Sequence, residues 1–93
     1  MITLDGYENA FIGFTERFTN NKFIAIYDRD KCIEITMHKR NLEKEDAIDW
    51  FEQNIDIMDK GEETPIIMFA MNYKKYLDLS EYLWGHHKHQ NDN

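Results

Sequence analysis

Hydrophobic residues in this chain follow two different spacings, and the order of these spacings restricts the possible folds more than any other feature. Residues 10–18 and 22–27 are rich in aromatic and β-branched side chains, a composition typical of strands. Between them lie Asn20 and Asn21, and asparagine tolerates the positive φ of a tight turn. The pattern therefore predicts a β-hairpin.

The faces of this hairpin follow from the length of its turn. If Asn20 and Asn21 form a two-residue loop, Phe14 lies opposite Tyr27 on one face, while Ile24 and Ile26 point to the other. Both faces then carry apolar groups. We expect other elements to cover each of them.

Two helices are expected after the hairpin. Asp28 or Asp30 caps the first, which runs to about His38. The second occupies residues 43–59 and stops near Gly61. The expected buried residues share one face of each helix: Cys32, Ile33, Thr36 and Met37 on the first, and Ala47, Ile48, Phe51, Ile55 and Met58 on the second.

A strand and a last helix are expected next. Pro65 would break a helix but is tolerated at the start of a strand, and the apolar run after it lacks alternation, which predicts a strand buried on both faces. Apolar residues then recur at helical spacing over residues 73–84, between a cap at Asn72 and a stop at Gly85. The order β-β-α-α-β-α predicts an α+β fold, a three-stranded sheet with helices packed on it and the last helix covering its second face.

Length and composition indicate one small intracellular domain. A chain of 93 residues suits a single domain, with an ordered core over about residues 8–85 and a polar tail at 86–93. One cysteine gives no internal disulfide, which favours a reducing compartment. The longest apolar run, residues 66–71, is far shorter than the roughly 20 residues of a membrane-spanning helix.

Three segments form a distinctive pattern: K-C-I-E-I at residues 31–35, E-D-A-I-D-W-F-E with Asn54 at residues 45–54, and G-E-E-T-P-I at residues 61–66. Together they resemble a family of short proteins encoded by tailed bacteriophages. Family members share a strand, K-C-I-E, a helix of the form E-[DE]-A-x-[DE]-[YW]-F-[DE]-x-N, and G-E-x-T-P-I. The resemblance implies a phage protein that acts in the host bacterial cytoplasm, and it implies no particular activity.

The formal charge of −7 is concentrated in one segment. Residues 41–63 hold nine acids against Lys44 and Lys60, while acids and bases balance elsewhere. Direct binding to nucleic acid is disfavoured, because it normally depends on lysine and arginine displacing counterions. A protein with a basic surface is a better partner.

Five of these acids have spacings of 4, 3, 4 and 3 and are predicted to share one helix face about 21 Å long. They are Glu45, Asp49, Glu52, Asp56 and Asp59. The ordinary interpretation is the solvated side of an amphipathic helix. The functional hypothesis is that this face imitates a nucleic-acid backbone and docks on a host or defence protein, as a non-enzymatic inhibitor or modulator.

Other candidate residues carry weaker signals. Cys32 near a helix start could be a nucleophile, although a buried apolar role fits it better, and His38 lies on a different side of that helix. A terminal cluster of His86, His87 and His89 lacks the rigid support of a metal centre. Because no catalytic or phosphate-binding motif occurs either, we expect no enzyme, metal or cofactor.

Leu79 and Tyr82 lie off the main apolar stripe of the last helix. They could cover a sheet edge or meet a partner. The alternative function is therefore a homodimeric sequestering or structural protein that associates through this helix.

Overall fold

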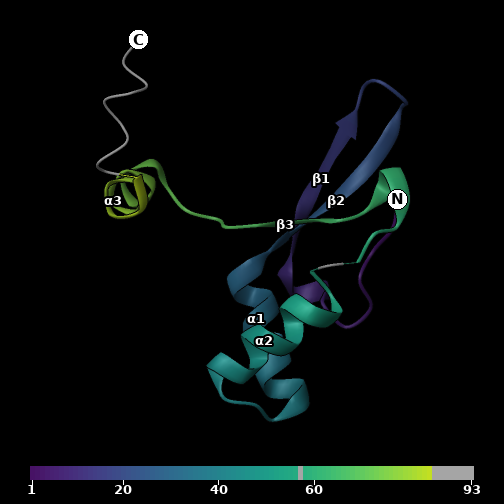
Figure 1. The fold of residues 1–93 in the computed structure, drawn as a ribbon. Helices are drawn as coiled ribbons and strands as arrows, with labels where there is room; N and C mark the ends of the chain where they lie inside the picture. The colour runs from purple at the N-terminus through teal and green to yellow at the C-terminus, as the bar shows by residue number, and fades with distance from the viewer. Residues whose placement is uncertain (57, 85–93) are drawn as a thin grey trace.

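The computed structural model describes residues 1–56 and 58–84, so the expected helix stop at Gly85 and the histidine-containing tail lie outside the described residues. The elements, shown in Figure 1, are η1 (Glu8–Ala10), β1 (Phe11–Arg17), β2 (Lys22–Asp28), α1 (Arg29–Arg40), α2 (Lys44–Asn54), η2 (Gly61–Glu63), β3 (Ile66–Met68) and α3 (Tyr73–Trp84). Apart from the two short 3₁₀ turns, this order confirms the predicted α+β fold with its β-β-α-α-β-α sequence.

The three strands form one sheet in the order β1-β2-β3. β1 and β2 are antiparallel, and the short β3 runs parallel to β2 with Ile66 beside Ile26. The hairpin was predicted correctly, but its loop has four residues, 18–21, instead of two. Phe14 therefore lies opposite Ala25, and the expected pairing of Phe14 with Tyr27 is wrong.

The core fills the space between one face of the sheet, the helices α1 and α2, and the N-terminal segment. Its buried residues are Leu4, Tyr7, Ala10, Ala25, Tyr27, Cys32, Ile33, Ala47 and Phe51. The first buried core residue along the chain is Leu4. Two hydroxyl groups tie it together: Tyr27 Oη accepts from the Leu4 amide at 2.8 Å, and Tyr7 Oη lies 2.8 Å from Thr36 Oγ1.

α1 follows its prediction closely. Asp28 caps it, with Oδ1 accepting from the amides of Asp30 and Lys31 at 3.0 and 3.4 Å. Of the four residues expected on its buried face, Cys32, Ile33 and Thr36 are buried and Met37 is partly buried against the core. The helix ends at Asn41, whose φ of 54° places it in the left-handed region.

α2 is shorter than predicted, because it ends at Asn54 and not at residue 59. The amides of Ile55 and Asp56 both donate to the Phe51 carbonyl, which closes the last turn. Carboxylates at a helix C-terminus are disfavoured by the partial negative charge there, so Asp56 and Asp59 oppose continuation.

The end of the chain departs most from expectation. β3 has only three residues, and Ile66 and Met68 are 42% and 39% exposed, so the prediction of a strand buried on both faces is wrong. α3 forms over the expected residues, capped by Asn72 Oδ1, which accepts from the Lys75 amide at 2.8 Å. It does not cover the sheet. Figure 1 shows it standing apart from the rest of the chain.

Candidate functional site, an exposed C-terminal arm

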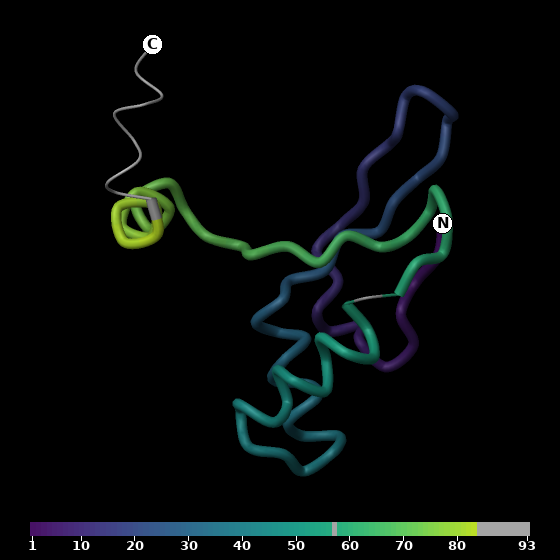
Figure 2. Tube along the Cα trace, viewed as in Figure 1, coloured from purple at the N-terminus to yellow at the C-terminus, as the bar shows by residue number. Residues whose placement is uncertain are grey.

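The feature that most needs a functional explanation is the C-terminal arm, by which we mean residues 69–84. Figure 2 shows the chain leaving β3, running outward through residues 69–72 and then coiling into α3. Many large apolar side chains of the arm are exposed: Phe69, Met71, Tyr73, Tyr76, Leu77, Tyr82 and Leu83. Soluble monomers rarely expose so many aromatic and aliphatic residues in one segment.

α3 is amphipathic. Tyr73, Tyr76, Leu77 and Leu83 fall on one stripe, and Tyr73 stacks on Tyr76 with ring centroids 5.9 Å apart. These four side chains are between 44% and 73% exposed. In an ordinary globular protein such a stripe faces a core, and here it faces solvent.

The two residues singled out on this helix have different surroundings. Tyr82 is 82% exposed, on the side opposite the stripe. Leu79 is partly buried and lines a hollow of about 480 Å³ between the arm and the start of α1. Leu79 thus packs toward the base of the arm, while Tyr82 is available to a partner.

The base of the arm is held by one aromatic contact. The Arg29 guanidinium lies 4.9 Å from the centre of the Phe69 ring, a cation–π distance. The hollow beside it is also lined by Asp30, Met71 and Lys75. These contacts fix where the arm leaves the body, by which we mean the described residues before position 69. They leave the rest of α3 uncovered.

The outer face of the sheet, opposite α1 and α2, is the second uncovered apolar surface. Gly13, Ile26 and Ile66 form a row across the three strands of this face. Ile66 and Met68 are exposed, and no described atom beyond its chain neighbours lies within 4 Å of where a Cβ on Gly13 would sit. On the same face Ile24 is buried and Ile26 is partly buried. The open part of the face is therefore around Ile66 and Met68.

A smaller apolar hollow lies on the inner face near the hairpin tip. It has a volume of about 200 Å³ and is lined by Met1, Phe14 and Phe23. Phe14 and Phe23 meet edge to face with centroids 5.6 Å apart. At this size it suits a single side chain and not a larger ligand.

The predicted acidic face is divided by the structure. Glu45 and Asp49 are exposed on α2, whereas Asp56 and Asp59 lie beyond its end, so the five acids do not share one helix face. Glu52 is engaged, because its Oε2 lies 2.6 Å from Nη2 of Arg29. Asp59 Oδ1 accepts from the Gly61 amide at 2.9 Å and shapes the next turn.

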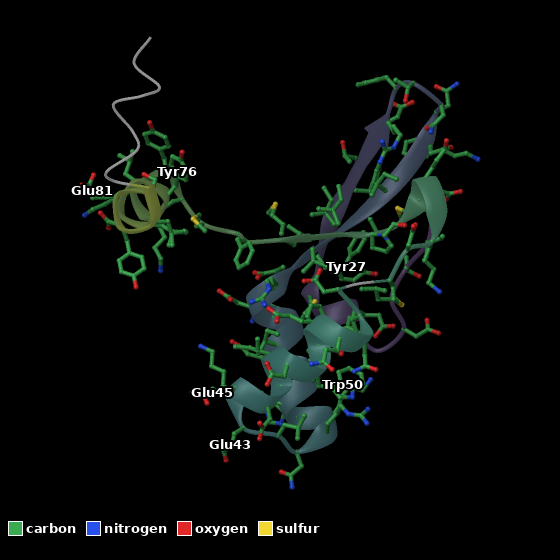
Figure 3. All side chains as sticks on the ribbon, in the orientation of Figure 1. Tyr27, Glu43, Glu45, Trp50, Tyr76 and Glu81 are labelled. Carbon is green, nitrogen blue, oxygen red and sulfur yellow. The ribbon has the colours of Figure 1, made fainter. Side chains whose placement is uncertain are left out.

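The remaining acidic surface is therefore short. Figure 3 shows Glu43 and Glu45 at the start of α2, away from the sheet. No described lysine or arginine lies within 4 Å of the Glu45 or Asp49 carboxylates. On the neighbouring side, Arg40 lies 4.1 Å from the centre of the Trp50 ring, which makes Trp50 part of the α1–α2 contact.

Cys32 is fully buried. Burial, and secondarily the charges of Asp28 and Asp56, raises the pKa of the Cys32 thiol from 9.0 to about 12. A nucleophilic cysteine needs a lowered pKa and access to its substrate, so the geometry opposes that role for Cys32.

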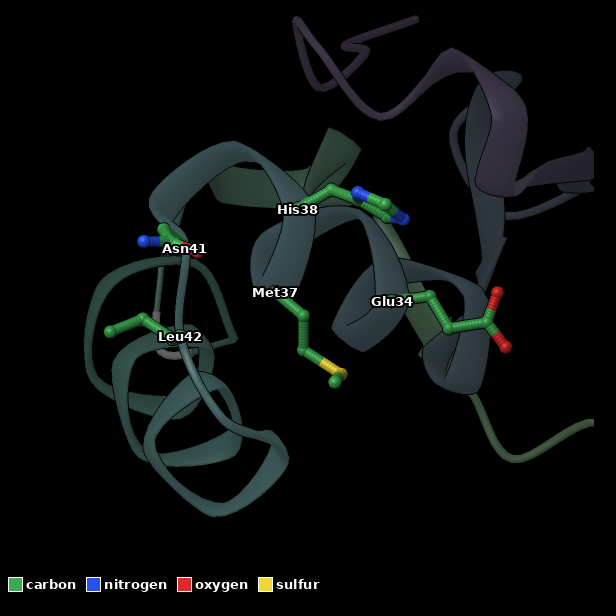
Figure 4. A pocket seen from close by; sticks show the side chains of 5 residues that line it. All are labelled: Glu34, Met37, His38, Asn41 and Leu42. Carbon is green, nitrogen blue, oxygen red and sulfur yellow. The ribbon is translucent and has the colours of Figure 1, made fainter.

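One open hollow of about 350 Å³ lies near the end of α1 (Figure 4). Glu34 and His38 extend to the same side of the helix, and Asn41 and Leu42 lie in the turn that follows it. Within residues 1–56 and 58–84, no group of three or more histidine, cysteine or carboxylate side chains could hold a metal ion. No helix over the same residues is long and apolar enough to cross a membrane.

A scan against protein-family models and searches of curated proteins and of solved structures found no match to this chain. The candidate site therefore stands on its own geometry. Sequence reasoning located α3 and its stripe but assigned that stripe to the core. The available signal was the pair Leu79 and Tyr82, since apolar residues on more than one side of a helix indicate a second contact.

Proposed function

We propose that this protein is a non-enzymatic binding protein that modulates another protein, and that the C-terminal arm is its binding element. One observation carries the proposal: α3 presents an exposed apolar stripe and has only sparse contacts with the other helices and strands of the described chain. In a helix-in-groove contact, one protein supplies an amphipathic helix and the other supplies an apolar groove. The stripe of α3 suits the first of these roles.

The stability of α3 gives a second reason to expect a partner. Isolated helices shorter than about 12–15 residues are marginal in water, because nucleation is costly. α3 has 12 residues and little tertiary support. Binding in a groove would stabilise the helix, and its tyrosines are of the type that dominates interface energies.

The expected partner is a host or defence protein in the bacterial cytoplasm. This expectation rests on the resemblance of residues 31–35, 45–54 and 61–66 to tailed-phage proteins. The arm is charge-balanced, with Lys74 and Lys75 against Asp78 and Glu81, so its contact with a partner is expected to be mainly apolar.

The test is quantitative affinity capture from bacterial lysate with the wild-type chain and the double variant Tyr76→Lys, Leu83→Lys. Proteins bound through the arm should be lost from the double variant. Asp78→Asn, a change on the polar side of α3, is the matched control and should capture the same proteins as the wild type. Equal capture by all three chains would contradict the arm as the binding element.

The acidic surface of α2 is a second candidate. It is supported by Glu45 and Asp49, which are exposed and have no described cation within 4 Å. Such a surface suits a basic protein, as a nucleic-acid mimic does. The double variant Glu45→Lys, Asp49→Lys should lose a basic partner whose binding weakens with salt, and unchanged capture by this variant would exclude the surface.

A further inference from the structure

We infer that, when no foreign partner is bound, the arm binds a second copy of this chain, with α3 of each copy lying across the outer face of the other copy's sheet. The inference rests on the proposed role of the arm and names its occupant in the free protein. The product is a dimer formed by reciprocal exchange of the arms, which has the twofold symmetry usual for homodimers.

The chain carries both halves of the contact. The donor is the apolar stripe of α3, built on Tyr76, Leu77 and Leu83. The acceptor is the row Gly13, Ile26 and Ile66 on the outer face, with Met68 beside it. Glycine in a strand often marks a close approach of another backbone, and the space above Gly13 is open.

The connection between β3 and α3 favours exchange over closure within one chain. Only residues 69–72 join them, which span at most about 14 Å when extended. Figure 2 shows this segment running outward from the sheet. Because α3 stands away from its own sheet, its stripe is free to meet the sheet of another molecule, and a short hinge of this kind favours domain swapping.

The area involved also favours two copies. The aromatic residues Phe69, Tyr73 and Tyr76 are 64%, 73% and 45% exposed. Since a fully buried aromatic side chain hides about 150–250 Å², they offer on the order of 350 Å². A single arm in a groove would hide roughly 700 Å² in total, well below the ~1,600 Å² of a standard interface, whereas two exchanged arms hide roughly 1,400 Å², which lies within the range of standard interfaces.

Charge predicts how salt acts on this dimer. The net charge of −7 lies in residues 1–68, and the arm is balanced. Two acidic bodies repel each other, and salt screens that repulsion. Added salt should therefore strengthen the dimer, whereas it weakens binding to a basic foreign partner.

Sedimentation equilibrium of the full chain is the first experiment. The wild type should be dimeric at micromolar concentration, and Tyr76→Lys should weaken the dimer by about 30-fold or more, as expected for a central interface residue. Ile66→Lys, on the acceptor face, should weaken it similarly. Asp78→Asn should leave it unchanged, and circular dichroism should show the same folded body in all variants.

Disulfide trapping between two different variants identifies the contact itself. One sample carries Ile66→Cys and the other Tyr76→Cys, and the native Cys32 is buried and slow to react. Mild oxidation of the mixture should give a mixed dimer joined through these positions. Glu45→Cys in place of Tyr76→Cys is the control and should give none above background.

Each alternative result contradicts a different statement. A monomeric wild type whose arm variants still lose captured proteins overturns the second copy and leaves the proposed function standing. A dimer without the mixed disulfide overturns the outer face as the acceptor. A disulfide formed within one doubly substituted chain shows that the arm closes on its own sheet. Arm variants that alter neither association nor capture overturn both proposals.

Discussion

The hydroxyl of Tyr27 holds the first buried residue of the chain in place. Its oxygen accepts from the Leu4 amide at 2.8 Å inside the core. We expect Tyr27→Phe to lower the free energy of unfolding by about 1–3 kcal/mol, because the buried amide then lacks its acceptor. Urea denaturation measures the loss. Tyr82→Phe, at a tyrosine that is 82% exposed and lies off the apolar stripe, is the control and should change stability by less than about 0.5 kcal/mol.

Cys32 should be inert in the folded protein. With its pKa raised to about 12 and its side chain buried, it forms almost no thiolate at neutral pH. Iodoacetamide at pH 7.5 should alkylate it rapidly in denaturant and very slowly without. Fast alkylation of the native chain would revive Cys32 as a reactive residue.

The same thiol makes stability depend on pH in the alkaline range. Its pKa is higher in the folded chain than in the unfolded one, so its contribution is complete below about pH 9 and is lost as pH rises toward 12. Cys32→Ala should lose less stability than the wild type over that range. Parallel pH profiles of unfolding free energy for the two proteins would contradict this expectation.

Single residues were predictable where the chemistry was local. Asp28 as a helix cap and Asn72 as another follow from side-chain oxygens next to free backbone amides. The bond from Tyr27 to Leu4 joins residues 23 positions apart, and no local pattern contains it. Neither does the ion pair that engages Glu52 with Arg29.

At the scale of elements, the link between α1 and α2 depends on the left-handed conformation of Asn41, with φ of 54°. Glycine adopts this conformation without steric cost, whereas alanine pays about 1 kcal/mol. We expect Asn41→Ala to destabilise the fold by about that amount and Asn41→Gly to be neutral or slightly stabilising. Thermal unfolding of the two variants beside the wild type measures the difference, and equal melting temperatures for Ala and Gly would contradict it.

Element boundaries were less predictable than element types. Acidic residues continue at helical spacing past Asn54, at Asp56 and Asp59. The helix nevertheless ends at Asn54, and carboxylates near a helix C-terminus oppose its continuation. The asparagine pair located the hairpin turn and not its length. Phe18, expected in the strand, belongs to the loop and is 83% exposed.

At the scale of the whole molecule, the thermal stability of the body should not depend on the presence of the arm. A chain ending at Asn72 should keep the melting temperature of the body, because α3 has only sparse contacts with the other elements of the described residues. The full chain, if its arms are exchanged, should melt at a temperature that rises with protein concentration, and the truncated chain should not. Calorimetry over a hundredfold concentration range decides this.

The position of α3 was the part of the fold that sequence could not provide. Its apolar stripe predicted burial, and the periodicity that reveals a stripe contains no information about which molecule supplies the covering surface. The core residues of α1 and α2 were predictable because their partner surface lies in the same chain, as with Cys32 and Phe51.

The shortness of β3 has a mechanical consequence. Any pull on the arm reaches the body through Ile66, Ile67 and Met68, the residues that pair with β2. The core lies against one face of the sheet, where Ile67 packs on it. Under load the strand should peel from the sheet at a lower force than unfolds the core, and each released residue adds about 3.3 Å to the tether. An assembly joined by the arm would therefore stretch before it breaks.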